Sequence, residues 1–347
     1  MSKEGDKVRT SGRTKPVQGD MSIQLPECQA FQFETPPGMP KAHGVTLVVG
    51  KRGAGKTVAC CNLLKKMEFD RIFILSPTIH SNKEMIEMLG ADEDDIYTDT
   101  NDIGSILGVK EAIEKERDDL EEYLRDKKQF DALKKRLEAA ADDIPDWTAG
   151  GKELEDAMLK FYSDGDFKPP YHKWGGKPPK CCLLLDDLIG SKIYQEQLTL
   201  NNLAILHRHV GQLKEGGAVG ISLYFLVQSY KAQHGGLSRP IRNQTTSFIL
   251  FQSKNIKELE EIAEEVGGEV DMAQFFEIYN RAIRVKHDFL FIDLHKKDEH
   301  ASMFRRNFDE FLLYDGCDTE EVAPVTDVPC LRRKARDDKK ENTSKET

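Results

Sequence analysis

The chain has 347 residues, of which 39% are hydrophobic and 32% charged, and its formal net charge is −10. Single hydrophobic cores stop growing at roughly 250 to 300 residues, so we expect one main domain with attachments. This composition is typical of a globular protein with a charged surface or long charged segments. The negative charge excludes a surface that is basic throughout, but it is compatible with a local basic channel in a ring of subunits.

The apolar runs are short, and the cysteines follow no known pattern. Runs such as 221–227 are far shorter than the roughly 20 residues that span a bilayer, so no membrane helix is expected. Residues 1–16 lack the apolar stretch of a secretory signal, which predicts a location in the cytosol or in a compartment continuous with it. The cysteines fit neither metal-ligand spacing nor a disulfide framework, and we expect reduced structural thiols. They are Cys28, Cys60, Cys61, Cys181, Cys182, Cys317 and Cys330.

In the amino-terminal part of the chain, the sequence predicts a flexible arm followed by a strand, a helix and a second strand. Residues 1–27 are polar without periodicity, which favours a flexible arm. Val45–Val49 is a β-branched apolar stretch ending at a glycine, and residues 56–67 have apolar side chains at helical spacing. Arg71–Ser76 reads as a second buried strand that Pro77 ends.

Residues 102–142 are rich in charged residues, leucine and alanine, and they predict a long charged helix or a helical hairpin inserted into the core. The leucines at helical spacing are Leu120, Leu124, Leu133 and Leu137. A solvated spacer is the simpler interpretation, and a partner-docking arm is the alternative. Residues 143–180 would lead back to the core. We therefore predict one domain over 28–317, with 102–180 as insertion and connector, and a disordered charged tail over 318–347.

The second half alternates strands with helices, which predicts a mostly parallel α/β sheet. Lys180–Asp187 is an apolar strand that ends in two acids. A terminal hairpin on the sheet edge is expected from 288–294 and 301–308. The remaining predicted elements are a helix over 195–213, strands over 221–227 and 247–251, and helices over 257–266 and 272–282.

Gly50–Thr57 reads GKRGAGKT and matches G-x-x-x-x-G-K-[ST] between the first strand and its helix. Glycines let successive backbone N–H groups converge on phosphate oxygens, and the helix amino terminus adds its positive dipole end. Lys56 would neutralise the β and γ phosphates, and Thr57 would bind Mg²⁺. ATP is favoured over GTP because no Asn-Lys-x-Asp segment occurs. The predicted nucleotide-binding residues are Gly50, Lys51, Arg52, Gly53, Ala54, Gly55, Lys56, Thr57 and Val58.

The acidic strand end is the second candidate part of the site. Asp186 is predicted to hold the metal, and Asp187, one residue further, to polarise the attacking water as general base. Turn acids after strands are common, so this interpretation depends on the upstream loop.

Further polar candidates lie beyond it. Gln228 follows strand 221–227, where it could reach the γ-phosphate or be a plain strand-end residue. Arg239 and Arg242 are expected in a loop before the next strand, and Arg242 is favoured as an arginine finger toward a ring neighbour. The segment His207–His209 lies on the predicted helix over 195–213, where surface polarity is the expected explanation.

The motifs GKRGAGKT, CCLLLDD, YFLVQSY and PIRNQTTSFILF occur in this order, followed by FLFIDL. Together they resemble the genome-packaging ATPases of poxviruses and other nucleocytoplasmic large DNA viruses, in the FtsK/HerA superfamily, over residues 44–312. The superfamily often has Glu at the position of Asp187, whose side chain reaches less far, and the charged segment 102–142 is long for this pattern.

The resemblance implies a RecA-like P-loop core with an additional strand between the two nucleotide motifs. It also implies a homo-oligomeric ring, pentamer or hexamer, that moves double-stranded DNA into a capsid with ATP and Mg²⁺. Contact with a capsid protein and a place in the host cytoplasm, the viral factory or the virion would follow. The alternatives are a nucleotide-dependent switch or scaffold that does not move DNA, and a small-molecule kinase, for which no arginine-rich lid is evident.

Overall fold

The computed structural model describes residues 33–81, 83–142, 169–188, 190–231, 237–266 and 270–314. The predicted arm and the predicted tail lie outside these ranges. The described residues divide into two compact units. The core unit contains residues 33–115, 179–210 and 219–314, and the helical unit contains residues 116–142, 169–178 and 211–218.

Within the described residues, the core unit contains one nine-stranded sheet in the order β3-β2-β4-β5-β1-β6-β7-β8-β9. The pairs from β3 to β6 are parallel, and those from β6 to β9 are antiparallel. The mostly parallel sheet and its terminal hairpin are therefore confirmed. The strands are β1 (Val45–Val49), β2 (Arg71–Leu75), β3 (Ile96–Tyr97), β4 (Cys181–Asp186), β5 (Ser222–Val227), β6 (Ser247–Phe251), β7 (Phe289–Asp293), β8 (Phe304–Arg306) and β9 (Glu310–Phe311).

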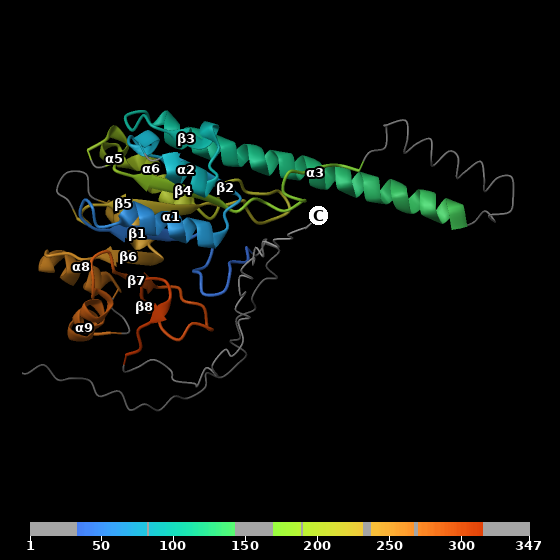
Figure 1. Ribbon diagram of the computed structural model, residues 1–347. Coiled ribbons are helices and arrows are strands. Elements are labelled where there is room, and N and C mark those ends of the chain that lie inside the picture. The colour runs from blue at the N-terminus through green and yellow to red at the C-terminus, as the bar shows by residue number, and fades with distance from the viewer. Residues whose placement is uncertain are drawn as a thin grey trace, which may run out of the picture. The chain divides into compact units, whose positions relative to one another are not determined.

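Helices cover both faces of this sheet (Figure 1). Apolar residues of α1 and α2 pack on one face, and those of α3, α5, α6, α8 and α9 pack on the other. Because both faces are covered, the parallel strands β1, β5 and β6 are buried at every residue instead of alternating with exposed residues. The helices are α1 (Lys56–Met67), α2 (Lys83–Leu89), α3 (Gly104–Asp142), α5 (Lys192–Gln195), α6 (Gln197–Leu206), α7 (Arg239–Asn243), α8 (Ile256–Val266) and α9 (Met272–Ala282).

Strand β1 shows how the sequence produces this two-sided burial. All five of its residues are buried. Val45, Leu47 and Val49 belong to one apolar cluster, and Val48 belongs to the cluster on the opposite face. Successive side chains of a strand point to opposite faces, so a continuous run of buried residues fills both cores.

Helix α3 is one continuous helix of 39 residues, so the hairpin alternative is wrong. Its first turns place Ile106, Val109 and Ile113 in the apolar cluster of the core unit. From Glu116 onward the helix belongs to the helical unit. Its exposed charges form pairs such as Lys110–Glu114, which stabilise a helix only slightly.

Lys180 lies directly before β4 and joins this strand to the end of α1. Its Nζ donates to the carbonyl of Met67 at 2.8 Å. Its backbone oxygen accepts from the N–H groups of Asp70 and Arg71 at 2.9 and 3.3 Å. Its own N–H donates to the Asp70 carboxylate at 2.7 Å. The carboxyl end of α1 and the start of β4 are thus held together.

The helix predicted over 195–213 is shorter than expected, because α6 ends at Leu206. The interpretation of His207 as surface polarity is also wrong, since its side chain is buried. Its ring nitrogens lie 2.6 Å from the Ala204 carbonyl and 2.8 Å from the His43 carbonyl. These contacts end the helix in a buried turn, which periodicity does not reveal.

A pH dependence of stability follows from the neighbouring His43. Burial lowers its pKa to about 4, and the charges of His207 and Arg208 act in the same direction. The unfolded chain therefore binds more protons below a pH of about 6.5, and stability present above that pH is lost as the pH falls toward 4. Between pH 7 and pH 5 we expect His43 alone to lower the free energy of unfolding, measured in urea, by about 2 kcal/mol.

The matched variant is His43→Asn, because His43 has a left-handed backbone with φ 55°, which asparagine tolerates. This variant should lose that part of the pH dependence. An unchanged slope between pH 7 and pH 5 would assign the effect to other groups.

Two further findings concern composition. The cysteines of the described ranges, Cys60, Cys61, Cys181 and Cys182, are buried thiols, as predicted. None of the helices in these ranges combines the length and the hydropathy needed to cross a bilayer.

Candidate functional site

The loop Gly50–Gly55 connects β1 to α1 at the carboxyl edge of the parallel strands. Gly53 and Gly55 have positive φ angles of 77° and 102°, which favour glycine. A Cβ on Gly50 would lie 2.8 Å from Cβ of Phe251, so the chain passes too close for a side chain. The first turn of α1 contains no acid and has no side-chain cap. Its N–H groups are therefore free to bind an anion.

Lys56 lies across this loop. Its Nζ donates to the carbonyls of Gly50 and Lys51 at 2.7 and 3.3 Å. Burial lowers the pKa of Lys56, although the carboxylates of Asp186 and Asp187 raise it. The ammonium is thus held, partly desolvated, inside the curve of the loop, where a bound phosphate would meet it.

Thr57 and Asp186 provide the oxygen ligands. The hydroxyl of Thr57 donates to Oδ2 of Asp186 at 3.3 Å, although the two residues are far apart in sequence. Burial raises the pKa of Asp186, Lys56 lowers it and Asp187 raises it. For both Lys56 and Asp186, burial changes the pKa more than their mutual attraction does. A cation bound between the Asp186 carboxylate and a phosphate would therefore stabilise the desolvated negative charge of Asp186.

The chemistry of these donors fits Mg²⁺. The ion takes hard oxygen ligands and is commonly held by one or two carboxylates together with substrate phosphates and waters. Among the described residues, no group of three or more His, Cys, Asp or Glu side chains could hold a metal alone. An ion at Thr57 and Asp186 would therefore need oxygens of the nucleotide to complete its coordination.

Asp187 and Gln228 lie beside this pair. Both side chains are exposed, and Nε2 of Gln228 donates to Oδ1 of Asp187 at 3.4 Å. Strands β4 and β5 are neighbours, so their carboxyl ends meet at one edge. Asp187 has φ 55°, a left-handed conformation that turns the chain directly after the strand. The structure thus brings together the four polar residues Thr57, Asp186, Asp187 and Gln228.

Arg242 lies in a different environment. It belongs to the short helix α7, so the prediction of a loop is wrong at this point. Its Nη1 donates to Oε1 of Glu265 at 2.6 Å, its guanidinium lies 5.2 Å from the ring centre of Tyr230, and the side chain is 12% exposed. Tyr230 also donates to Glu265. Arg242 is therefore paired within its own chain, whereas Arg239 is exposed.

A cavity of 590 Å³ lies beside the phosphate-binding loop and was not predicted. Gly55 and Val58 line one side, and Phe251, Phe289 and Phe308 contribute aromatic surface. Val58 is 62% exposed, which is unusual for a valine on a core helix. These residues come from distant strands, so the only local signal was the position of Val58 directly after Thr57.

His287 joins this cavity to the loop. Its Nδ1 lies 2.9 Å from the carbonyl of Ala54, and its backbone has φ 74°. The strained residue is held by Asp288, whose Oδ2 accepts from the N–H groups of Arg284 and Val285 at 3.1 and 3.0 Å. Backbone strain of this kind persists only where surrounding contacts hold it.

The strand order completes the description of the fold. β5 lies between β1, which leads into the loop, and β4, which ends in the acids. A curled glycine loop after β1, an acidic strand and one additional strand between these two define a RecA-like P-loop NTPase fold, as the motif order implied.

Three of the solved structures to which the chain is similar illustrate the likeness. The DNA-packaging ATPase B204 from Sulfolobus Turreted Icosahedral Virus is 13% identical, with 79% of this chain and 99% of that chain covered and a TM-score of 0.39. The conjugation coupling protein TcpA of pCW3 is 15% identical, with 77% and 67% covered and a TM-score of 0.37. VirB4 of Thermoanaerobacter pseudethanolicus is 15% identical, with 72% and 87% covered and a TM-score of 0.35.

Because these TM-scores are below 0.5, the fold is assigned from the strand order and the geometry of the site alone. Neither a scan against protein-family models nor a search of curated proteins finds a match.

Proposed function

We propose that this protein hydrolyses ATP with Mg²⁺ at the carboxyl edge of its sheet. The observation that carries the proposal is the distance of 3.3 Å between Thr57 Oγ1 and Asp186 Oδ2, next to a glycine loop with Lys56 inside it. The loop amides and Lys56 would bind the phosphates, and Thr57 with Asp186 would hold Mg²⁺, which neutralises charge developing on the transferred phosphoryl group. Asp187 would accept a proton from water, and Gln228 would orient that water or the γ-phosphate.

The cavity beside the loop supports a purine nucleotide as the substrate. Its aromatic side chains include Phe289 and Phe308, whose ring centres are 4.8 Å apart, and its 590 Å³ is within the range of ligand pockets. An apolar cleft next to the first turn of α1 would bury a base while the loop holds the triphosphate. We propose that adenine occupies this cavity.

Filling the cavity should weaken ATP binding without affecting the phosphate loop. For Val58→Trp we expect the Kd of ATP to rise about tenfold, because the indole would occupy the space of the base. The Kd of inorganic tripolyphosphate, which has no base, should stay within about twofold. Calorimetric titration of both ligands measures the two constants.

Leu198→Trp is the matched control, because Leu198 is 74% exposed on α6 and does not line the cavity. This control should bind both ligands like the native chain. If Val58→Trp weakens tripolyphosphate as strongly as ATP, the base does not bind in this cavity.

We further propose that ATP hydrolysis drives translocation of double-stranded DNA, and that the translocated DNA is a viral genome entering its capsid. The order of the four motifs along the chain supports this proposal, together with the position of β5 between the two nucleotide motifs. The same proposal includes a homo-oligomeric ring and contact with a capsid protein. It also includes localisation in the host cytoplasm, the viral factory or the virion.

The decisive experiment measures ATP turnover with and without linear duplex DNA. A motor should be stimulated by DNA in the native protein and inactive in Lys56→Ala under both conditions. ATP turnover that DNA does not change would instead favour the nucleotide-dependent switch or scaffold.

The proposed arginine finger can be tested separately. Arg242 would have to exchange Glu265 for the phosphates of a neighbouring subunit, and the exposed Arg239 on the same helix is the alternative. Mixed rings of Arg242→Ala and Lys56→Ala subunits should recover part of the ATPase activity, because some interfaces then combine an intact arginine with an intact loop. Rings mixed with Arg239→Ala subunits provide the comparison, and recovery only in that mixture would assign the role to Arg239.

A further inference from the structure

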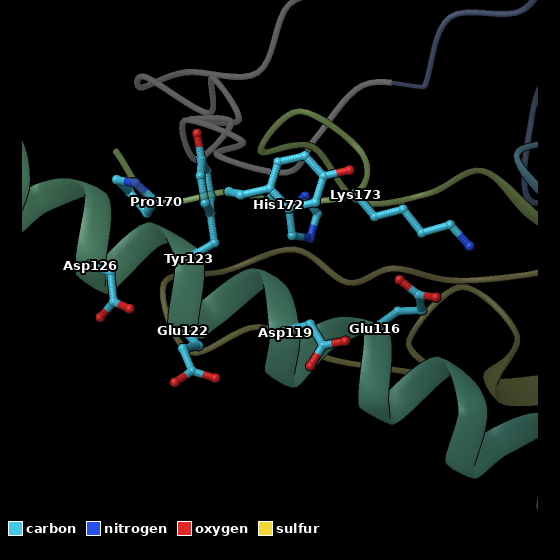
Figure 2. A pocket seen from close by; sticks show the side chains of 9 residues that line it. Glu116, Asp119, Glu122, Tyr123, Asp126, Pro170, His172 and Lys173 are labelled. Atoms are coloured by element: carbon cyan, nitrogen blue, oxygen red, sulfur yellow. The ribbon is translucent and has the colours of Figure 1, made fainter. Parts of the chain in front are cut away.

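The helical unit contains an acidic groove between α3 and the segment 170–173. Figure 2 shows Tyr123 extending from α3 toward this segment, with Asp119, Glu122 and Asp126 on successive turns of the same helix. The groove has a volume of 420 Å³ and also includes His172. Acidic side chains alone would indicate only a solvated helix face. The buried His172 is a second and independent indication of a binding site.

His172 is 8% exposed, and its imidazole lacks one hydrogen bond. Its Nδ1 accepts from the backbone N–H groups of Trp174 and Gly176 at 3.3 and 3.1 Å. The proton of the neutral ring is therefore on Nε2. Within the described residues, this Nε2–H has no partner. A buried donor in this state favours a ligand that brings an acceptor, such as a peptide carbonyl.

The carboxylates of the groove differ in how far they are already neutralised. Glu116 is buried and accepts from Nε1 of Trp174 at 2.7 Å. Glu122 and Asp126 share the single cation of Arg125 at 3.5 and 3.3 Å. Asp119 is exposed and forms no ion pair within the described ranges. Lys173 is the one cation among the residues that line the groove, so its four carboxylates retain negative charge that a cationic ligand would neutralise.

The ring of Tyr123 adds a surface for cations. Lys127 already lies 5.8 Å from the centre of this ring. Guanidinium groups bind aromatic faces in the same manner and more often than ammonium groups do. Carboxylates, an aromatic face and a buried N–H together match an arginine-rich peptide, and they would repel the phosphates of DNA.

The chain itself contains such a peptide. Residues 332–336 read RRKAR, with four cations in five residues. In an extended peptide, alternate side chains lie about 6.6 Å apart on one side, so Arg332, Lys334 and Arg336 would span about 13 Å. On α3, Asp119 and Asp126 are separated by about 10 Å along the helix axis. We propose that residues 332–336 dock in this groove, with a backbone carbonyl accepting from Nε2 of His172.

The test uses a synthetic peptide of residues 329–342, labelled through Cys330, and fluorescence anisotropy with the full-length protein. The reversed protein is a variant in which the charge of this segment is changed from positive to negative. It carries Arg332→Glu, Arg333→Glu, Lys334→Glu and Arg336→Glu, so that its own segment leaves the groove open. This protein should bind the peptide, and the native protein should bind it about tenfold more weakly because its own segment competes.

Variants of the groove are then introduced into the reversed protein. Asp119→Lys with Asp126→Lys should weaken peptide binding by about tenfold or more, since attraction becomes repulsion. Glu111→Lys with Asp131→Lys changes the charge of α3 by the same amount outside the groove and should cost less than about threefold. His172→Asn, whose side-chain oxygen can accept in place of Nδ1 but which has no donor at the position of Nε2, should weaken binding about threefold or more.

The proposal is overturned if the peptide fails to bind the reversed protein at low salt. Equal losses in the two paired lysine variants would also overturn it, because binding would then follow the overall charge of α3. A His172→Asn protein that binds like its parent would also overturn it, because the unpartnered Nε2–H would then contribute nothing to binding.

Discussion

Lys56→Ala should lower the rate of ATP hydrolysis by roughly 10²- to 10³-fold at saturating Mg·ATP. The native ammonium is held within the loop by the carbonyls of Gly50 and Lys51. Its low dielectric surroundings strengthen its attraction for phosphate oxygens, and no other described side chain takes its place there. A phosphate-release assay measures the rate, and the effect should appear mainly in kcat, because charge on the phosphoryl group is greatest in the transition state.

Lys51→Ala is the control for this effect. It removes a cation of equal charge from the same loop, but the Lys51 side chain is exposed, and only its backbone carbonyl contacts Lys56. Its activity should remain within about threefold of the native value. Equal losses in the two variants would indicate a general dependence on positive charge and would contradict a specific role of Lys56.

Asp187→Asn is expected to reduce kcat by roughly 10²-fold and to leave the Kd of Mg·ATP nearly unchanged. The amide is the same size as the carboxylate but cannot take a proton from water. The side chain is exposed, so the substitution should not affect stability. Single-turnover hydrolysis and equilibrium binding of a fluorescent ATP analogue separate the two constants.

Asp186→Asn supplies the comparison for Asp187. Its carboxylate accepts from Thr57, so its loss should weaken nucleotide binding that depends on Mg²⁺ as well as the chemical step. Asp187→Glu should recover more activity than Asp187→Asn, because it restores a base with a longer reach. If Asp187→Asn keeps the native kcat, another group activates the water.

Much of the fold could be predicted because the decisive patterns are local. The bounds of β1, α1, β6 and α9 agree with the structure to the residue. Each is either a short apolar run or a helix with regular apolar spacing. α9 also begins with a capping box between Asp271 and Gln274, which stabilises its first turn.

Other elements depend on contacts between distant residues. β3 has only two residues and α2 has no buried residue, so neither produces a strong periodic pattern. The motif PIRNQTTSFILF indicated a functional role for Arg242. The pairing of Arg242 with Glu265, however, depends on α8 lying beside α7 in the folded chain. Likewise, the aromatic cavity combines Phe251, Phe289 and Phe308, which only the folded sheet brings together.

Helix α1 contacts β4 at both of its ends, through Thr57 with Asp186 and through Met67 with Lys180. These two attachments are separated by about 15 Å of helix, a length over which an α-helix behaves as a stiff rod. A shift of Asp186 upon loss of the γ-phosphate would therefore move the helix and the strand as one body. The displacement would reach Lys180, where the chain enters β4. Loss of the γ-phosphate at one edge of the sheet would therefore change the position of the chain at the opposite edge.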